Sequence, residues 1–98
     1  MKVYLKIHKN ESSEVIAACD DNILGIILRK ENLIIKISEQ FYGGNLIEIE
    51  DAITTLRNTN NFNIVGKNII KACIDNNIIT EDGCIEIDGI PMAIKFIF

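Results

Sequence analysis

The sequence predicts an α+β fold: a mostly antiparallel sheet of about five strands, with two longer helices packed on one of its faces. Three observations predict it. Short apolar stretches alternate with a period of two, two later segments have the spacing of amphipathic helices, and an Asp-Gly pair lies between apolar runs near the C-terminus. An excess of β-branched residues, 22 isoleucines against 6 leucines, also favours strands.

The N-terminal residues are predicted to form a β-hairpin. Val3, Leu5 and Ile7 alternate with polar or aromatic neighbours, which is the period of a half-buried strand. After a polar turn, residues 14–19 read as a second strand, and the short connection predicts antiparallel pairing.

The next stretch is predicted to contain a helical turn and a third strand. Asp20-Asp21-Asn22 supplies N-cap chemistry for a short helical turn around Ile23 to Ile26. The apolar run that begins at Leu33 and ends at Ser38 is predicted to be the third strand.

Two segments in the second half are predicted to be helices. Apolar residues recur at helical spacing in 49–56 and again in 66–74, and acidic residues lie in the first turn of the earlier segment. Asn76-Asn77 can close the later helix in the left-handed region. Residues 62–65 either pair as a strand or span the gap between the helices.

The C-terminal hairpin is predicted in register. With Asp88-Gly89 as a two-residue turn, Ile87 pairs with Ile90 and Ile85 with Met92. One face, assigned to the helix side, then carries the apolar residues of both strands: Ile85, Ile87, Ile90, Met92, Ile94, Phe96 and Phe98.

Length and composition limit the function classes. Residues 1–98 are expected to form one domain, without membrane span or secretion signal, and thus to be cytoplasmic. Cys19, Cys73 and Cys84 lack metal-ligand spacing, so buried reduced thiols are expected and neither metal nor cofactor is predicted. A net charge of −4 argues against a general nucleic-acid binder, and no DNA partner is expected.

The segment Ser38-Glu39-Gln40-Phe41-Tyr42-Gly43-Gly44 contains more than a strand exit requires. Two glycines permit positive φ or close backbone approach, and two aromatic rings supply contact area. We therefore predict that Phe41, Tyr42, Gly43 and Gly44 form an exposed binding loop.

Carboxylates follow two predicted strands. If the strand ends meet, Asp20 and Glu39 face each other near Tyr42 and form an acid–base or metal corner, the pocket of a small enzyme or ligand-binding protein. The alternative is that Asp20 or Asp21 caps a helix and Glu39 is solvated. Nothing in the sequence completes a catalytic set, so no catalytic residue is assigned.

The entry into the second helix has a related ambiguity. Residues 63–67 run from an extended segment through Gly66 into the helix, a geometry that can hold an anion on free N–H groups. The alternative is that Gly66 only allows a tight entry and close packing.

A lysine-bearing sheet face is also predicted. Tyr4 and Lys6 lie opposite the apolar residues of the first strand, and alternation places Lys36 and Lys95 on the same outer side. Such a face suits a protein groove or RNA. The alternative is an ordinary solvated sheet face.

Four motifs occur in the order found in a set of small archaeal proteins: Ala17-Ala18-Cys19-Asp20, Ser38 to Gly44, Asn63-Ile64-Val65-Gly66, and Asp88-Gly89-Ile90-Pro91. The chain resembles the archaeal domain of unknown function 424 family over nearly its whole length. The resemblance implies a weak link to archaeal translation and ribosome-associated genes. We therefore expect a non-catalytic module with a protein or ribonucleoprotein partner. A small enzyme or ligand-binding protein is the alternative.

Overall fold

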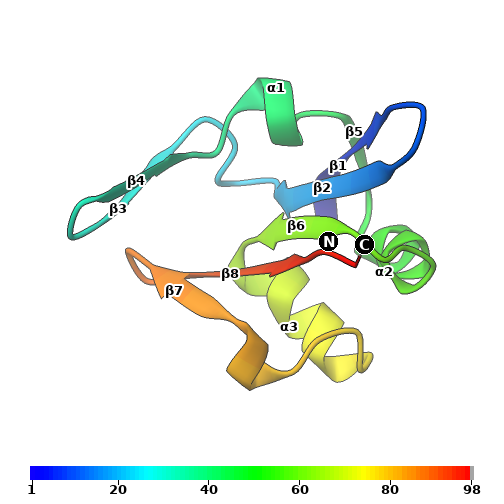
Figure 1. Ribbon diagram of the computed structural model, residues 1–98. Helices are drawn as coiled ribbons and strands as arrows, with labels where there is room; N and C mark the ends of the chain where they lie inside the picture. The colour runs from blue at the N-terminus through cyan, green and yellow to red at the C-terminus, as the bar shows by residue number, and fades with distance from the viewer. Residues whose placement is uncertain (98) are drawn as a thin grey trace.

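The computed structural model describes residues 1–97, and a six-stranded sheet lies at its centre (Figure 1). Its strand order is β5-β1-β2-β6-β8-β7. The bounds of its strands are Lys2–Lys9 (β1), Glu14–Asp20 (β2), Asn45–Glu48 (β5), Phe62–Val65 (β6), Ile85–Ile87 (β7) and Ile90–Lys95 (β8). A separate hairpin, here called the arm, consists of β3 (Ile27–Lys30) and β4 (Leu33–Lys36).

The α+β class is confirmed, but the sheet is mixed. The expected β1–β2 hairpin is present, whereas β2 and β6 pair in parallel, with Ile16 opposite Phe62 and Cys19 opposite Val65. Parallel neighbours need a long crossover. Here the whole segment between them, which contains the arm and two helices, makes that connection.

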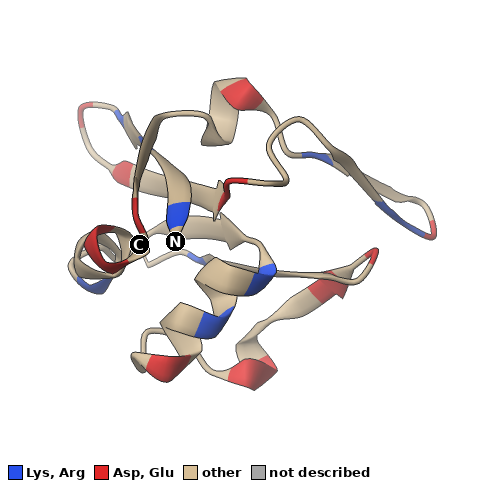
Figure 2. Cartoon of the chain, turned by 180° about the vertical axis from the view of Figure 1, so that it is seen from behind, with Lys and Arg blue, Asp and Glu red and all other residues tan. Residues whose placement is uncertain are grey.

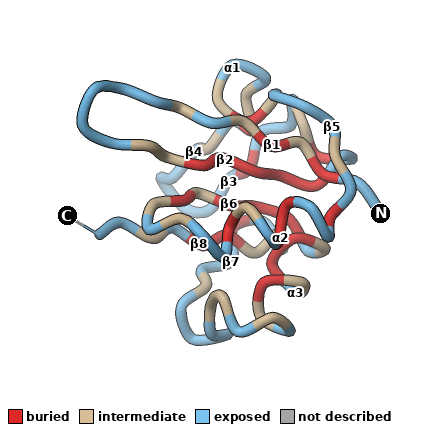
Figure 3. The backbone as a smooth tube through the Cα atoms, turned by 90° about the vertical axis from the view of Figure 1, so that its right-hand side faces the viewer, coloured by how far each residue is buried: buried red, intermediate tan, exposed pale blue. Residues whose placement is uncertain are grey.

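Both longer helices lie on one face of the sheet, as predicted. These are α2 (Ile49–Arg57) and α3 (Lys67–Asp75), and we call the side they cover the helix face. Their apolar stripes pack on Val3, Ile16 and Phe62 of the central strands. Figure 3 shows buried backbone segments in these strands and in both helices. Among the helices of residues 1–97, none has the length and apolar character needed to cross a bilayer.

The opposite face is also covered, which the sequence analysis did not expect. A one-turn helix, α1 (Glu39–Tyr42), and the arm pack there around a second apolar cluster that includes Cys19, Leu28 and Met92. We call this side the arm face.

One local prediction is wrong, one predicted strand is shorter than expected, and two strands, β3 and β5, were missed. Residues 23–26 form turns, with the N–H of Ile26 donating to the Ile23 carbonyl, because Gly25 takes φ +92° and ends any helical path. The run after Leu33 is a strand that ends at Lys36, but it pairs in the arm. β5 was not expected.

The C-terminal hairpin has the predicted register, with Ile85 opposite Met92 and Ile87 opposite Ile90. Asp88 and Gly89 have φ of +55° and +79°, as a type I′ turn requires. Its apolar side, however, lies on the arm face: the pairing Lys6–Ala17–Asn63–Ile94 aligns Ile94 with Lys6. Phe98, predicted on the same side, lies outside the described residues.

Candidate functional site

Asp20 caps a distant helix. The last residue of β2, it points to the helix face, and its carboxylate accepts the backbone N–H of Asn68 at 2.8 Å and that of Ile69 at 2.9 Å. Those N–H groups begin α3 and have no partner inside the helix. Capping of a nearby turn by Asp20 was one alternative from the sequence, but the N–H group of Asn68 that Asp20 caps lies 48 residues away.

Gly66 provides the space for this carboxylate. It precedes α3 with φ +131°, and a Cβ there would lie 2.6 Å from Oδ1 of Asp20. The helix entry does hold an anion, and that anion is Asp20. Burial raises the pKa of the Asp20 carboxyl, the two N–H donors lower it, and Asp21 raises it further.

The aromatic–diglycine segment is a packed corner, and the prediction of an exposed loop is wrong. Ser38 caps α1 by accepting the N–H of Phe41, and the Tyr42 ring is only 3% exposed. The Tyr42 hydroxyl donates to Oδ1 of Asn63 at 2.7 Å, and burial, then Cys19, raises the pKa of Tyr42 to about 12. A hydroxyl held in this way is a structural group.

Phe41 is half-buried and stacks on His8. The ring centroids are 4.7 Å apart at 17°, and Nε2 of His8 donates to the Phe41 carbonyl at 2.7 Å. Lys6 donates to the Gln40 carbonyl from the same strand. These contacts fix α1 on β1, and because of them the sheet face on which Tyr4 and Lys6 lie is covered.

The two glycines serve close packing. A Cβ on Gly43 would lie 2.6 Å from the Glu39 carbonyl oxygen, and one on Gly44 would collide with the Leu5 carbonyl. Neither glycine has positive φ. Paired glycines thus indicated a close approach correctly, but the approach is internal.

The predicted corner of Asp20, Glu39 and Tyr42 does not form. Asp20 reaches the helix face, whereas Tyr42 packs in the cluster on the arm face. Glu39 is exposed, and the pocket between α3 and the C-terminal hairpin, described below, is lined by none of the three. The alternation of successive strand residues, which sends Cys19 and Asp20 to opposite faces, is the physical reason.

The predicted lysine face is wrong as well. Lys6 lies on the arm face beside α1, Lys36 belongs to the arm, and Lys95 pairs with Phe62 and so lies on the helix face. The error came from assigning the apolar side of the C-terminal hairpin to the helices. Tyr4, predicted with them, is half-buried against the cluster on the arm face.

Two of the three thiols are buried as predicted, and Cys84 is half-exposed. Burial, together with a smaller contribution from nearby groups, raises the pKa of Cys19 and of Cys73 to about 12, and burial also raises the pKa of Cys84. A thiol of that pKa is roughly one part in ten thousand thiolate near pH 8 and is a poor nucleophile.

We expect iodoacetamide to alkylate Cys84 first and to leave Cys19 and Cys73 unmodified in the native protein. Peptide mass spectrometry after timed quenching measures this, and all three should react alike in denaturant. Native alkylation of Cys19 at the rate of Cys84 would contradict its buried position.

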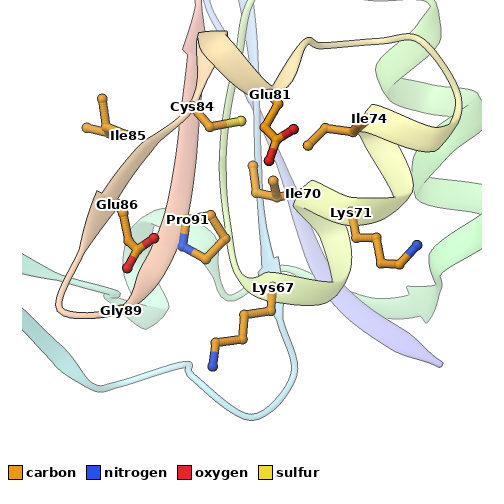
Figure 4. A pocket seen from close by; sticks show the side chains of 10 residues that line it. All are labelled: Lys67, Ile70, Lys71, Ile74, Glu81, Cys84, Ile85, Glu86, Gly89 and Pro91. Carbon is orange, nitrogen blue, oxygen red and sulfur yellow. The ribbon is translucent and has the colours of Figure 1, made fainter.

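A pocket of about 520 Å³ lies between α3 and the C-terminal hairpin (Figure 4). Ile70, Ile74 and Pro91 form its apolar floor, Lys67 and Lys71 lie on the helix side, and acidic residues on the other. The ammonium of Lys71 is 2.8 Å from Asp75 of its own helix. The rim therefore offers exposed charges of both signs and no selective polar group.

The arm presents a different surface. Leu28 is buried and its partner Ile35 packs beside it, while Nζ of Lys30 donates to the Glu86 carbonyl at 3.1 Å. This inner side holds the arm on the body of the protein. The outer side consists of two cross-strand pairs, Ile27–Lys36 and Arg29–Ile34, all four exposed.

Charge on the arm opposes that of the whole chain. Arg29, Lys30 and Lys36 lie on it with one acid, Glu31, at the turn (Figure 2), whereas the chain carries −4. Within residues 1–97, no ion pair involves Arg29 or Lys36. Ile27 and Ile34 are 46% and 61% exposed. This outer side is the candidate binding surface.

Sequence reasoning missed Ile27 and Arg29. The signal was two apolar segments separated by Glu31-Asn32, which is hairpin spacing. Glu31 takes φ +54°, a conformation normally filled by Gly, Asn or Asp, so the turn did not resemble a hairpin turn.

Comparison with known proteins places the chain in a family. Residues 8–98 match the family described as "Protein of unknown function (DUF424)". The fold is similar to the crystal structure of an uncharacterized conserved protein from Methanopyrus kandleri, with a TM-score of 0.83, 27% identity, and coverage of 96% of this chain and 90% of that one. None of the curated proteins compared with the chain matches it. The resemblance in the sequence motifs is thereby confirmed, and the chain belongs to the DUF424 family.

Proposed function

We propose that this protein is a non-catalytic binding module that holds a protein or ribonucleoprotein partner through the outer side of the arm. The observation that carries the proposal is the exposed set Ile27, Arg29, Ile34 and Lys36 on a hairpin held to the body by its other side. Isolated exposed apolar residues are ordinary. Two of them alternating with two unpaired cations form a surface suited to an anionic partner.

The anchoring of the arm supports the proposal. Leu28, Ile35 and Lys30 keep its inner side in place, so the outer side is ordered before a partner arrives. Ordering a loop on binding costs free energy that a preformed surface avoids.

The use of the reactive groups also supports a binding role. The Asp20 carboxylate accepts hydrogen bonds from the start of α3. The Tyr42 hydroxyl is hydrogen-bonded to Asn63, and the His8 ring nitrogen to the Phe41 carbonyl. Chemistry at any of these groups would have to break a bond that stabilises the fold.

A translation partner is the specific form of the proposal. This form rests on the weak link to translation genes that the sequence resemblance implies, and on the anionic surfaces of ribonucleoproteins, which suit a cationic arm. The aromatic–diglycine segment was predicted to contact the partner directly. In this proposal it instead fixes the position of the chain that follows β4.

The test is co-purification with tagged protein from native extract at two salt concentrations. The double variant Ile27→Asp, Ile34→Asp should lose at least tenfold of the captured partner, while Leu46→Asp, as exposed as Ile27 at 46% but on β5, should retain it. Exposed substitutions usually cost about 0.5 kcal/mol of stability or less, so both variants should stay folded by circular dichroism. Undiminished capture by the folded double variant would overturn the proposal.

A further inference from the structure

The backbone of β4 has an unpaired edge. In a hairpin, pairs that exchange hydrogen bonds alternate with pairs that do not. The N–H of Ile37 donates to the Ile26 carbonyl, which makes Ile26–Ile37, Leu28–Ile35 and Lys30–Leu33 the bonded pairs. Ile34 and Lys36 therefore direct their N–H and C=O groups away from β3, and no bond to them is recorded within residues 1–97.

The other edges near the arm are occupied or differently charged. β3 faces β7, and Lys30 donates to the Glu86 carbonyl on the edge of β7. At the far edge of the main sheet, Glu48 of β5 pairs with the N-terminal amine at 3.7 Å and with Lys2 at 3.9 Å, so that edge carries no unpaired cation. Only β4 combines a free edge with unpaired positive charge among these strands.

The side chains along this edge indicate which residue types a partner strand should carry. Ile34 and Lys36 are the residues whose backbone points outward, and their side chains share the exposed outer side of the arm with Arg29. A strand added to β4 would place residues two apart beside Ile34 and Lys36. An apolar residue fits beside Ile34, and a carboxylate fits beside Lys36, on the same exposed side as the long Arg29 side chain of β3.

We infer that the free edge of β4 accepts an extended acidic segment of a partner protein as an additional strand, an inference that rests on the binding role proposed above. Backbone hydrogen bonds to Ile34 and Lys36 supply affinity, and the alternating apolar and acidic side chains supply selectivity. The long-chain cations of the arm steer the acidic segment to the edge.

The same features argue against RNA as the occupant. Proteins that bind single-stranded RNA stack the bases on aromatic rings. The outer side of the arm has two isoleucines and no aromatic residue. An exposed backbone edge, in turn, offers a peptide a row of hydrogen bonds and offers RNA no equivalent pairing.

The probe is an acetylated peptide of sequence Val-Thr-Glu-Thr-Val-Thr-Glu, which places valine and glutamate alternately on one side of a strand. Amide hydrogen exchange is measured by NMR with and without it. We expect the Ile34 and Lys36 amides to exchange at least tenfold more slowly with peptide. The Ile35 amide, already bonded within the arm, is the internal control and should not change.

Two control peptides separate the contributions. Replacing glutamate by lysine should abolish the protection, and added salt should weaken binding of the parent peptide. Methylating the peptide's backbone nitrogens that face β4 should also abolish the protection of the Ile34 and Lys36 amides. If the methylated peptide binds as well as the parent, the side chains dock without strand addition, which overturns this inference while the binding role stands.

Further outcomes would overturn the inference. One is no slowing at Ile34 with about 5 mM peptide, a concentration above a millimolar Kd. Another is that an oligouridine perturbs Arg29 and Lys36 more than the peptide does. A third is protection of Ile34 that rises with protein concentration alone, which would make a second copy the occupant. Loss of the binding role would instead appear as undiminished partner capture by the double variant of Ile27 and Ile34.

Discussion

Replacing Asp20 by alanine should lower the free energy of unfolding by about 2–4 kcal/mol. The change leaves the N–H groups of Asn68 and Ile69 without acceptors at a largely buried helix start, and each such group costs about 1–3 kcal/mol. For a domain of this length the melting temperature should fall by roughly 10–20 °C. Urea unfolding followed by circular dichroism measures the effect.

The adjacent aspartate is the matched control. Asp21 is exposed and accepts no hydrogen bond in the described residues, so Asp21→Ala should change stability by about 0.5 kcal/mol or less. Equal losses for the two variants would show that the cap does not stabilise α3. Gly66→Ala should be costly as well, and less so in a protein that already carries Asp20→Ala, because the Cβ would then meet no carboxylate.

The pH dependence of the same site has a defined sign. Burial raises the pKa of Asp20, so the folded state binds this proton more tightly than the unfolded chain does. The protonated Asp20 carboxyl therefore stabilises the fold fully below the pKa of the unfolded chain, about 3.9. This stabilisation is lost as the pH rises through the raised pKa of the folded state. Relative to Asp20→Asn, the wild type should therefore lose stability over that range. A relative gain would mean that the two N–H donors outweigh burial.

Replacing Tyr42 by alanine should destabilise the protein by about 3–4 kcal/mol, the scale for deleting a buried aromatic side chain. The ring fills the cluster on the arm face, and its removal leaves a cavity beside Cys19. Tyr42→Phe removes only the hydrogen bond to Asn63 and should cost about 1 kcal/mol. Chemical denaturation of the three proteins gives both values.

The chain offers a second tyrosine as a control for this series. Tyr4 is half-buried at the margin of the same cluster, so Tyr4→Ala should cost clearly less than Tyr42→Ala. If Tyr42→Ala leaves the melting temperature within a few degrees of wild type, the ring is outside the core, and the aromatic–diglycine segment becomes a candidate contact surface again.

Local chemistry in the sequence determined the two hairpins of the main sheet and the two longer helices. Asp88-Gly89 specifies a two-residue turn and thereby the pairing of Ile85 with Met92, and the spacing of apolar residues specifies α2 and α3. These signals extend over a few residues, so they can be read without knowing what the segment packs against. Family membership was likewise readable from motif order alone.

Only the tertiary structure decided which face each group occupies and what it contacts. The periodicity of a strand defines two sides but does not say which side the helices cover, so Lys95 was placed with Lys6 although it lies on the helix face. Likewise, a glycine permits close approach without naming its neighbour: Gly66 adjoins a carboxylate from residue 20, and Gly44 adjoins a carbonyl from residue 5. Contacts between residues this far apart depend on strand order and on the parallel β2–β6 pair, which no local pattern encodes.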